Sequence, residues 1–381
     1  MVGADRNRFD RHSRRDLSLF ILVLVAGGFA AIEAVLAALP DATVARAGER
    51  PFPPPRELLL REYQPNARFA FAPPPIRRTY PGSHPVRAVY PLDTDGDGFI
   101  EPGRVHRGPA KTVVFLGGST TEAMYVDPEN RFPHRAARLL EAQLGVPVNG
   151  LNAGRSGNNS LHANLLLTGK VLPLRPDVVV LMEAVNDLGV LASHGSYLTA
   201  SRDLGPLRTP RAGLEPAVQR FRDALLPHTW RAVKRAATVV RRHPDAGAVG
   251  TAAPLLPPGG DQIDLWTGNY EASLRQFVAT ARAWHIEPVL MTQARLPATD
   301  EGGNFVSDVM AEAHAAFNAR LRHVATVEKV ALIDLAAARG WTRHELYDGL
   351  HFNDTGSLAA AEIVAGALAE ILRRSQPLAS Q

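Results

Sequence analysis

A serine follows the first strand-like apolar run of the chain's main pattern. The motif GGSTTE places Ser119 directly after the β-branched run TVVFLG at 112–117, where a helical pattern begins. In an open α/β sheet, ligands collect beyond the carboxyl ends of the strands, and a helix N-terminus there favours developing negative charge. Ser119 therefore occupies a position suited to a nucleophile. The alternative is that the motif only caps a helix, because Ser and Thr accept backbone hydrogen bonds there.

Two further polar loops follow the next predicted strands. NAGRSGNNS at 152–160 ends the second strand, and Asn186 and Asp187 follow the third. An esterase needs hydrogen-bond donors aimed at a tetrahedral oxyanion, and the Gly157 amide and the Asn186 side chain could converge beside Ser119. The alternatives are a left-handed turn at the glycine and a helix cap at the Asn-Asp pair.

A histidine near the C-terminus has a carboxylate three residues before it. In YDGLHFNDTG (347–356), Asp348 precedes His351, after the last predicted strand and before the last predicted helix. A hydroxyl nucleophile needs a base, and that base needs a carboxylate on its other nitrogen to orient it. The D-x-x-H loop predicts that these two groups lie together.

The apolar pattern predicts the elements that must bring these loops together. Strand-like runs alternate with helical periodicity from residue 110 onward, which predicts a parallel, doubly wound sheet covered on both faces. The five predicted strands lie at 112–117, near 147–154, and at 177–183, 287–292 and 330–335. Each polar loop described above follows a different strand.

The four motifs in this order resemble the SGNH superfamily of GDSL-type esterases and lipases over about residues 110–373. The resemblance implies that Ser119 is the nucleophile of a serine esterase, with Asp348 and His351 completing a triad. It also implies that Gly157 and Asn186 form the oxyanion hole with the Ser119 amide. The implied fold is a flavodoxin-like three-layer α/β/α sandwich with a five-stranded parallel sheet, and the implied reaction needs no metal or organic cofactor.

The chain departs from the superfamily pattern at two positions. Gly118 stands where the name-giving motif has aspartate, and Ala184 stands where glycine usually opens the third block. Altered support of the nucleophile turn and some crowding near the oxyanion hole are expected. The GGSTTE form with an N-terminal apolar segment resembles members associated with bacterial cell-surface polysaccharides. The expected function is hydrolysis of acyl esters, above all acetyl esters, on a carbohydrate or related substrate at the cell envelope. The alternatives are an O-acyltransferase acting on cell-surface polysaccharide and a non-catalytic glycan-binding scaffold.

Residues 17–39 form a nearly unbroken apolar run whose only charged residue is Glu33. At about 1.5 Å per helical residue, this run spans a hydrocarbon core of about 30 Å. Five arginines precede it and three follow closely, so the positive-inside rule predicts a cytoplasmic tail at 1–16. We expect a single-pass anchor in a bacterial cytoplasmic membrane with the catalytic domain extracytoplasmic. The alternative is a signal peptide cleaved after Val35-Leu36-Ala37.

Proline-rich sequence at 40–109 predicts an extended stalk between the anchor and the domain at 110–375. Within it, DTDGDGFI at 93–100 copies the start of an EF-hand loop, but Arg104 occupies the position that needs a bidentate glutamate. A tight turn is the favoured interpretation of this segment.

A basic insertion at 194–260 interrupts the domain, and residues 376–381 form a short tail. From 202 to 242 the insertion holds ten basic and three acidic side chains, a local charge of +7. It is interpreted as a solvated face, with contact to anionic headgroups or an acidic glycan as the alternative.

Composition excludes several classes of site. The chain has no cysteine, which excludes disulfides, thiolate zinc sites and cysteine nucleophiles. The P-loop motif is also absent, because no lysine follows the glycines of GGSTTE. The net charge, 42 − 38 = +4, does not predict nucleic-acid binding. An acylated small molecule or glycan is the expected substrate.

Overall fold

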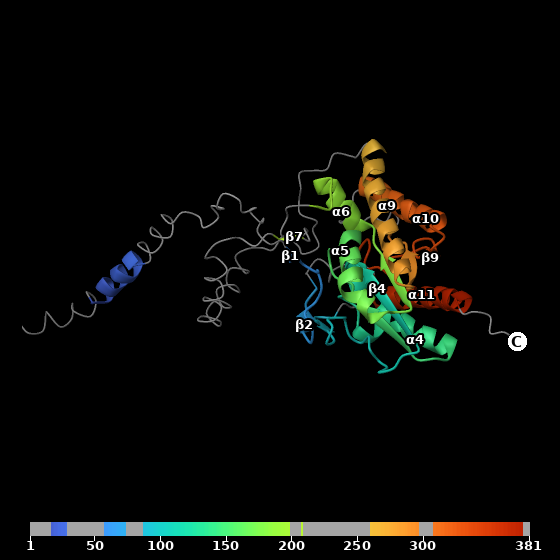
Figure 1. The fold of residues 1–381 in the computed structure, drawn as a ribbon, viewed down its shortest axis with the longest axis horizontal. Coiled ribbons are helices and arrows are strands. Elements are labelled where there is room, and N and C mark those ends of the chain that lie inside the picture. Colours follow the sequence, from blue (N-terminus) through green and yellow to red (C-terminus); the bar gives the residue numbers. More distant parts are fainter. Residues whose placement is uncertain are drawn as a thin grey trace, which may run out of the picture. The chain divides into compact units, whose positions relative to one another are not determined.

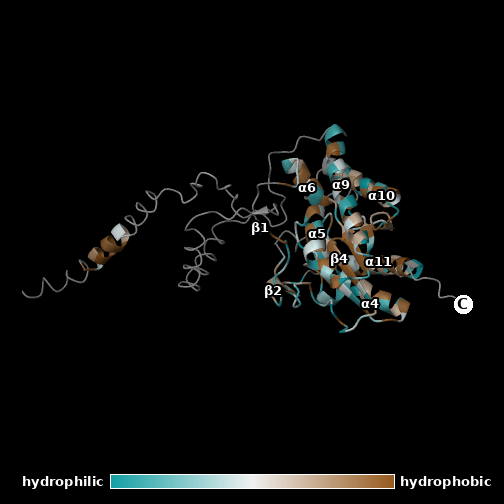
Figure 2. Ribbon diagram, in the orientation of Figure 1, coloured by the Kyte–Doolittle hydropathy of each residue, from teal (hydrophilic) through white to brown (hydrophobic). Residues whose placement is uncertain are grey.

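The computed structural model describes residues 17–28, 57–73, 87–198, 207–208, 260–296 and 308–375. The chain divides into two units, Met1–Pro55 and Arg56–Gln381. In the first unit, Leu17–Gly28 is an apolar helix (Figure 2). Its large side chains from Leu17 to Val25 are all exposed. The predicted anchor at 17–39 is therefore helical over its described part, and 29–39 lies outside the described residues.

Five parallel strands form the central sheet of the second unit, in the order β5-β4-β6-β8-β9. The strands are β4 (Lys111–Gly117), β5 (Val148–Asn152), β6 (Val178–Met182), β8 (Glu287–Met291) and β9 (Ala331–Ile333). The first of these strands, β4, pairs with the second on one side and the third on the other. This order is flavodoxin-like and puts a topological switch point beside β4, where such sheets bind ligands. The predicted five-stranded parallel sheet is confirmed.

Helices cover both faces of this sheet (Figure 1). In β4, Val113 and Phe115 share a core cluster with the two helices of one face. Val114 and Leu116 share a second cluster with the four helices of the other face. This alternation buries both faces of a parallel strand and gives three layers. The helices of the first face are α4 (Phe132–Leu144) and α11 (Asp354–Ser375). Those of the second are α5 (Ser160–Leu166), α6 (Val185–His194), α9 (Gly260–Ala283) and α10 (Asp308–Val327).

Short helical segments connect these elements. They are α3 (Ser119–Glu122), η1 (Pro128–Asn130), η2 (Leu167–Val171) and η3 (Leu172–Leu174). Ser119 and its three following residues thus form a single helical turn directly after β4.

The segment predicted as a stalk differs from that expectation. Residues 57–73 and 87–109 belong to the second unit, where β1 (Glu57–Leu58) pairs with β7 (Leu207–Arg208) and β2 (Arg68–Phe71) pairs with β3 (Tyr90–Asp93). Tyr63, Leu92 and Ile100 are buried together, and Ile100 bridges to Asn152 at the end of β5. The stalk prediction is therefore wrong for these residues. Their strands are at most four residues long, too short for alternation to stand out in proline-rich sequence.

The acidic segment at 93–100 is a tight turn closed by its own side chains. The Asp95 carboxylate accepts hydrogen bonds from the backbone N–H groups of Asp97 and Phe99, both at 2.9 Å. Arg104 donates to the same carboxylate at 2.6 Å and to Asp97. The arginine at the twelfth loop position thus supplies the positive charge next to these acids.

One described helix is long and apolar enough to cross a membrane by length and composition alone, the span Asp354–Arg374 of α11. Half of that apolar window is buried inside the structure. Its side chains Val364, Ala365 and Leu368 are fully buried in the cluster that also contains α4 and the sheet. This helix is a layer of the sandwich, and its apolar composition reflects that burial. The predicted basic insertion lies largely outside the described residues.

Candidate active site

The turn at Ser119 is built from two glycines in tight surroundings, where a larger residue would force neighbouring atoms to move. Strand β4 ends at Gly117, and an ideal Cβ on this residue would overlap Oγ1 of Thr121 and lie 2.7 Å from the carbonyl oxygen of Met182. Gly118 is the N-cap of α3, and its carbonyl accepts the N–H of Glu122 at 3.0 Å. The chain can therefore turn sharply from the sheet into the helix, which places Ser119 at the first helical position.

Ser119 lies next to the histidine of the D-x-x-H loop, 232 positions away in the sequence. Its Oγ is 2.7 Å from Nε2 of His351. The other ring nitrogen of His351, Nδ1, is 2.8 Å from Oδ2 of Asp348 and 3.0 Å from Oδ1. A hydroxyl, an imidazole and a carboxylate are thus connected in series, which is the arrangement that activates a serine hydroxyl for nucleophilic attack.

The D-x-x-H loop is held rigidly at the carboxyl end of the sheet. Asp348 Oδ1 accepts the backbone N–H groups of Leu350 at 2.9 Å and His351 at 2.8 Å. The Tyr347 ring stacks on the His351 ring with centroids 5.5 Å apart and planes 7° apart. Asp348 and His351 are both buried, 6% and 7% exposed. The local loop therefore fixes the imidazole orientation before any substrate arrives.

The Asn186 side chain lies against the Ser119 turn. An ideal Cβ on Gly118 would overlap Nδ2 of Asn186 and lie 3.2 Å from the carbonyl oxygen of Asn158. Nδ2 donates to that carbonyl at 2.7 Å, and a carboxamide nitrogen carries a second N–H that can be offered elsewhere. The N-cap of α6 is Ala184, and the Asn186 side chain bonds across to another loop, so Asn186 is not the cap of this helix.

The loop that follows β5 runs alongside the end of β4. The N–H of Ala153 donates to the carbonyl of Phe115 at 2.9 Å, and the N–H of Arg155 donates to that of Gly117 at 3.1 Å. Gly157 in this loop has a φ of +77°, a left-handed conformation that favours glycine. The loops carrying Ser119, Gly157 and Asn186 therefore meet at one edge of the sheet.

Gln293 joins two of these turns, and its role was not predicted from the sequence. Its Nε2 donates to Oγ1 of Thr120 at 2.9 Å, and its Oε1 accepts the N–H of Val185 at 2.9 Å. One carboxamide thus braces the residues next to Ser119 and Asn186. The available signal was its position, because Gln293 is a polar residue just beyond the carboxyl end of β8.

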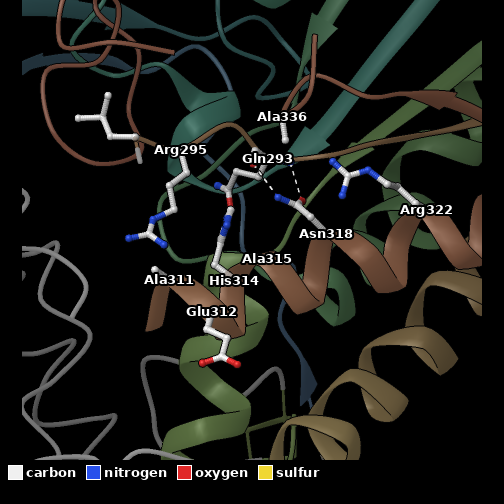
Figure 3. Close-up of a pocket in the computed structure, with 10 residues that line it drawn as sticks. Gln293, Arg295, Ala311, Glu312, His314, Ala315, Asn318, Arg322 and Ala336 are labelled. Atoms are coloured by element: carbon white, nitrogen blue, oxygen red, sulfur yellow. Dashed lines mark hydrogen bonds between the residues drawn. The ribbon is translucent and has the colours of Figure 1, made fainter. Parts of the chain in front are cut away.

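A hollow of about 500 Å³ opens on the other side of Gln293, between the loop after β8 and α10 (Figure 3). Arg295, His314 and Arg322 contribute to its lining, whereas Ser119 and His351 do not. Burial, with a smaller effect of the Arg295 charge, lowers the pKa of His314 to about 3, so this imidazole is neutral at pH 7. The hollow lies on the side of Gln293 that faces away from the Ser119 hydroxyl, and Gln293 is the residue that braces the two turns.

Three buried carboxyl groups lie around the site. Burial raises the pKa of Glu122, and hydrogen bonds from Ser156 and Tyr63 oppose the rise. Burial also raises the pKa of Asp187 to about 6 against hydrogen bonds from Ser160 and Tyr197. For Glu183, burial and the neighbouring Asp187 carboxylate raise the pKa well above its ordinary value. These groups lie beneath the turns, where their protons bear on stability and positioning.

The departure at Ala184 places no strained backbone in the third block. Its φ of −164° is an extended value that any residue adopts.

Among the described residues, no group of three or more His, Asp or Glu side chains is arranged to hold a metal ion. The connected series of Ser119, His351 and Asp348 can support acyl transfer through the serine hydroxyl.

Comparison with known proteins gives no match among curated proteins. An acetylxylan esterase from Geobacillus stearothermophilus is similar in structure, with 17% identity over 69% of this chain and 94% of that chain and a TM-score of 0.38. A putative GDSL-like lipase from Parabacteroides merdae has 14% identity over 69% of this chain and 97% of that chain, with a TM-score of 0.42. A hydrolase named LAE5, from the metagenome of Lake Arreo, has 17% identity over 70% and 97%, with a TM-score of 0.40.

A family model covers the region that carries the site. The model of the GDSL-like Lipase/Acylhydrolase family matches residues 115–359, from the end of β4 to the start of α11. This match spans well over half of the 381 residues and includes every loop that meets at the carboxyl edge of the sheet. With that extent of match on a flavodoxin-like sheet, the chain belongs to the GDSL-like lipase/acylhydrolase family of hydrolases.

Proposed function

We propose that this protein is a membrane-anchored serine esterase that removes acetyl groups from a carbohydrate at the cell envelope, with Ser119 as nucleophile. The observation that carries the proposal is the connected series of Ser119 Oγ, His351 and Asp348, with links of 2.7 and 2.8 Å. Family membership supports the hydrolysis of an acyl ester.

The proposed reaction has two halves. In the first, Nε2 of His351 takes the Ser119 proton as Oγ attacks the ester carbonyl, and a tetrahedral intermediate forms. Its oxyanion is held by the N–H groups of Ser119 and Gly157 and by Nδ2 of Asn186. The intermediate collapses, the sugar oxygen leaves with the proton from His351, and an acyl-enzyme remains.

In the second half, His351 takes a proton from water as the water oxygen attacks the acyl-enzyme. The ester bond to Ser119 breaks, the proton returns to Oγ, and the free acid is released. Asp348 stays ionised throughout and stabilises the imidazolium that forms in each half.

The GGSTTE motif and the apolar N-terminal segment support the envelope-glycan part of the proposal. Both features resemble superfamily members associated with bacterial cell-surface polysaccharides. The described part of the anchor, Leu17–Gly28, is helical and exposes its apolar side chains, as a membrane helix would. Five arginines precede it, which favours a catalytic domain outside the cytoplasm.

The nucleophile is tested with Ser119→Ala in the full chain. We expect hydrolysis of p-nitrophenyl acetate and labelling by a fluorophosphonate to be lost while the thermal unfolding temperature is kept. Ser196→Ala is the matched control, because this serine is exposed and its Oγ accepts the N–H of Leu198 two residues on. Undiminished turnover by folded Ser119→Ala protein would refute the proposal.

The substrate is tested with acyl chains of graded length and with acetylated oligosaccharides. We expect acetyl esters to be the preferred substrates and free acetate to be the main product when unmodified oligosaccharide is added. Preference for long acyl chains would point to a lipid ester instead. Acetylated sugar as the main product in dilute buffer would make the protein an O-acyltransferase, since both reactions share the acyl-enzyme.

A further inference from the structure

The segment before the family match is fastened to the loop that carries Gly157. The family model begins at residue 115, but the stretch between β1 and β2, residues 59–67, lies in the same unit and contacts that loop (Figure 1). Arg61 in this stretch makes three contacts with three consecutive residues.

The Arg61 guanidinium holds two neighbouring carbonyl groups. Its Nη2 donates to the carbonyl oxygen of Ser156 and its Nη1 donates to that of Gly157, each at 3.0 Å. The carbonyl oxygen of Arg61 in turn accepts Nδ2 of Asn158 at 3.0 Å. An arginine presents its donors in a planar fork, so two acceptors are fixed relative to each other.

Holding the Ser156 carbonyl also fixes the Gly157 N–H. These two groups belong to one peptide unit, which is planar and trans, so they point in opposite directions. With its carbonyl held by Arg61, this peptide must direct the Gly157 N–H away from the guanidinium. The guanidinium also leaves no room for a side chain at position 157, since an ideal Cβ on Gly157 would lie 2.8 Å from Nη2 of Arg61.

Arg61 also supports the position of Asn186. The Asn158 carbonyl that accepts Nδ2 of Asn186 at 2.7 Å belongs to a residue whose side chain is bonded to the Arg61 carbonyl. Two of the three proposed oxyanion donors, the Gly157 N–H and the Asn186 carboxamide, are therefore connected to Arg61. The third, the Ser119 N–H, comes from α3.

The residues beside Arg61 keep this segment in place. Glu62 pairs with Lys170 at 2.6 Å, and its carbonyl accepts a hydrogen bond from Arg155. Tyr63 donates to Glu122 of α3, and the Arg155 guanidinium lies 4.7 Å from the centroid of its ring. Arg61 is thus carried on a segment that is itself anchored to η2, α3 and the loop after β5.

We propose that Arg61, which lies outside the family match, is a positioning residue of the oxyanion hole that orients the Gly157 N–H toward the substrate. This inference rests on the proposed function, because it assumes that an oxyanion forms beside Ser119. Its effect is expected on turnover, since an oxyanion donor acts most strongly in the transition state.

The test compares Arg61→Ala and Arg61→Lys with Glu62→Gln in the full chain. Loss of one oxyanion donor lowers kcat by about 10²–10³-fold, and we expect the misdirected donor in Arg61→Ala to cost about 10–100-fold with KM nearly unchanged. Added guanidinium ion should restore part of the lost kcat. The kcat of Arg61→Lys should lie between those of the wild type and Arg61→Ala, because an ammonium group lacks the planar fork of a guanidinium. Glu62→Gln weakens the same segment without touching the Ser156 and Gly157 carbonyls, so its kcat should stay close to that of the wild type.

Each other outcome has a definite meaning. Wild-type kcat in Arg61→Ala, with Ser119→Ala inactive, refutes the positioning role and leaves the proposed function intact. Equal losses in Arg61→Ala and Glu62→Gln also refute it, because they show general loosening of the segment. If Arg61→Ala does not fold, a wild-type kcat in folded Arg61→Lys has the same consequence. Full activity in Ser119→Ala would instead remove the proposed function itself.

Discussion

The carboxamide of Asn186 fills the space where a side chain at position 118 would begin. An ideal Cβ on Gly118 would overlap Nδ2 of Asn186. The glycine that replaces the aspartate of the Gly-Asp-Ser motif therefore allows Asn186 to lie directly beside the nucleophile turn. The departure from the motif and the position of the proposed oxyanion donor are two aspects of one packing arrangement.

We expect Gly118→Ala to displace the Asn186 side chain and to lower kcat by about 10-fold or more, because a donor moved away from the oxyanion loses its stabilising effect. Gly118→Asp, which restores the name-giving motif, should lower kcat further than Gly118→Ala does. Steady-state kinetics with p-nitrophenyl acetate measures both. Gly349→Ala is the control, since a Cβ there meets nothing within 4 Å although the residue follows Asp348 directly. Wild-type kcat in Gly118→Ala would show that Asn186 can move without consequence.

Asn186→Ala removes the carboxamide itself. We expect kcat to fall by about 10²–10³-fold, the usual cost of deleting one oxyanion donor. The unfolding temperature should change little, because the side chain is not the cap of α6. A loss below about threefold, measured with the same ester, would mean that Asn186 only packs between the two turns.

Glu183→Gln tests the buried carboxyl beneath Asn186. Burial raises the pKa of Glu183, so between its ordinary pKa and the raised value the folded protein holds one more proton than the unfolded chain. Stability then falls as pH rises through that window, whereas glutamine does not titrate. We therefore expect the unfolding temperature of Glu183→Gln minus that of the wild type to be larger at about pH 8 than at about pH 4. Thermal melts at both pH values measure this, and a pH-independent difference would contradict it.

The N-terminal segment is tested by extraction. Full-length protein should stay in the membrane pellet after alkaline carbonate, because an apolar run of this length spans the hydrocarbon core. A chain that begins at Pro40 should be released and should keep its esterase activity, since it retains Arg56–Gln381 as one unit. Recovery of a mature protein that begins near Ala38 would identify the segment as a cleaved signal peptide.

The strands and the residues that follow them could be predicted from the sequence. Apolar runs such as 112–117 and 177–183 fill positions buried on both faces of a parallel sheet, so their composition alone marks them. Since parallel strands end at a common edge, residues just beyond them, such as Ser119 and Asn186, had to lie near one another. The Asp348–His351 contact could also be predicted from the sequence, because both residues belong to one short loop.

Only the tertiary structure placed the segment before residue 110 on the domain. Arg61 holds the carbonyl oxygens of Ser156 and Gly157, groups that every residue type carries, so no pattern in the sequence marks the acceptor. The two partners are also about a hundred positions apart and belong to stretches without periodicity. The close packing of Asn186 against Gly118 could not be predicted from the sequence for a related reason. Sequence patterns report which side chains prefer burial or a turn, whereas a close approach between a backbone and a distant side chain exists only once the chain has folded.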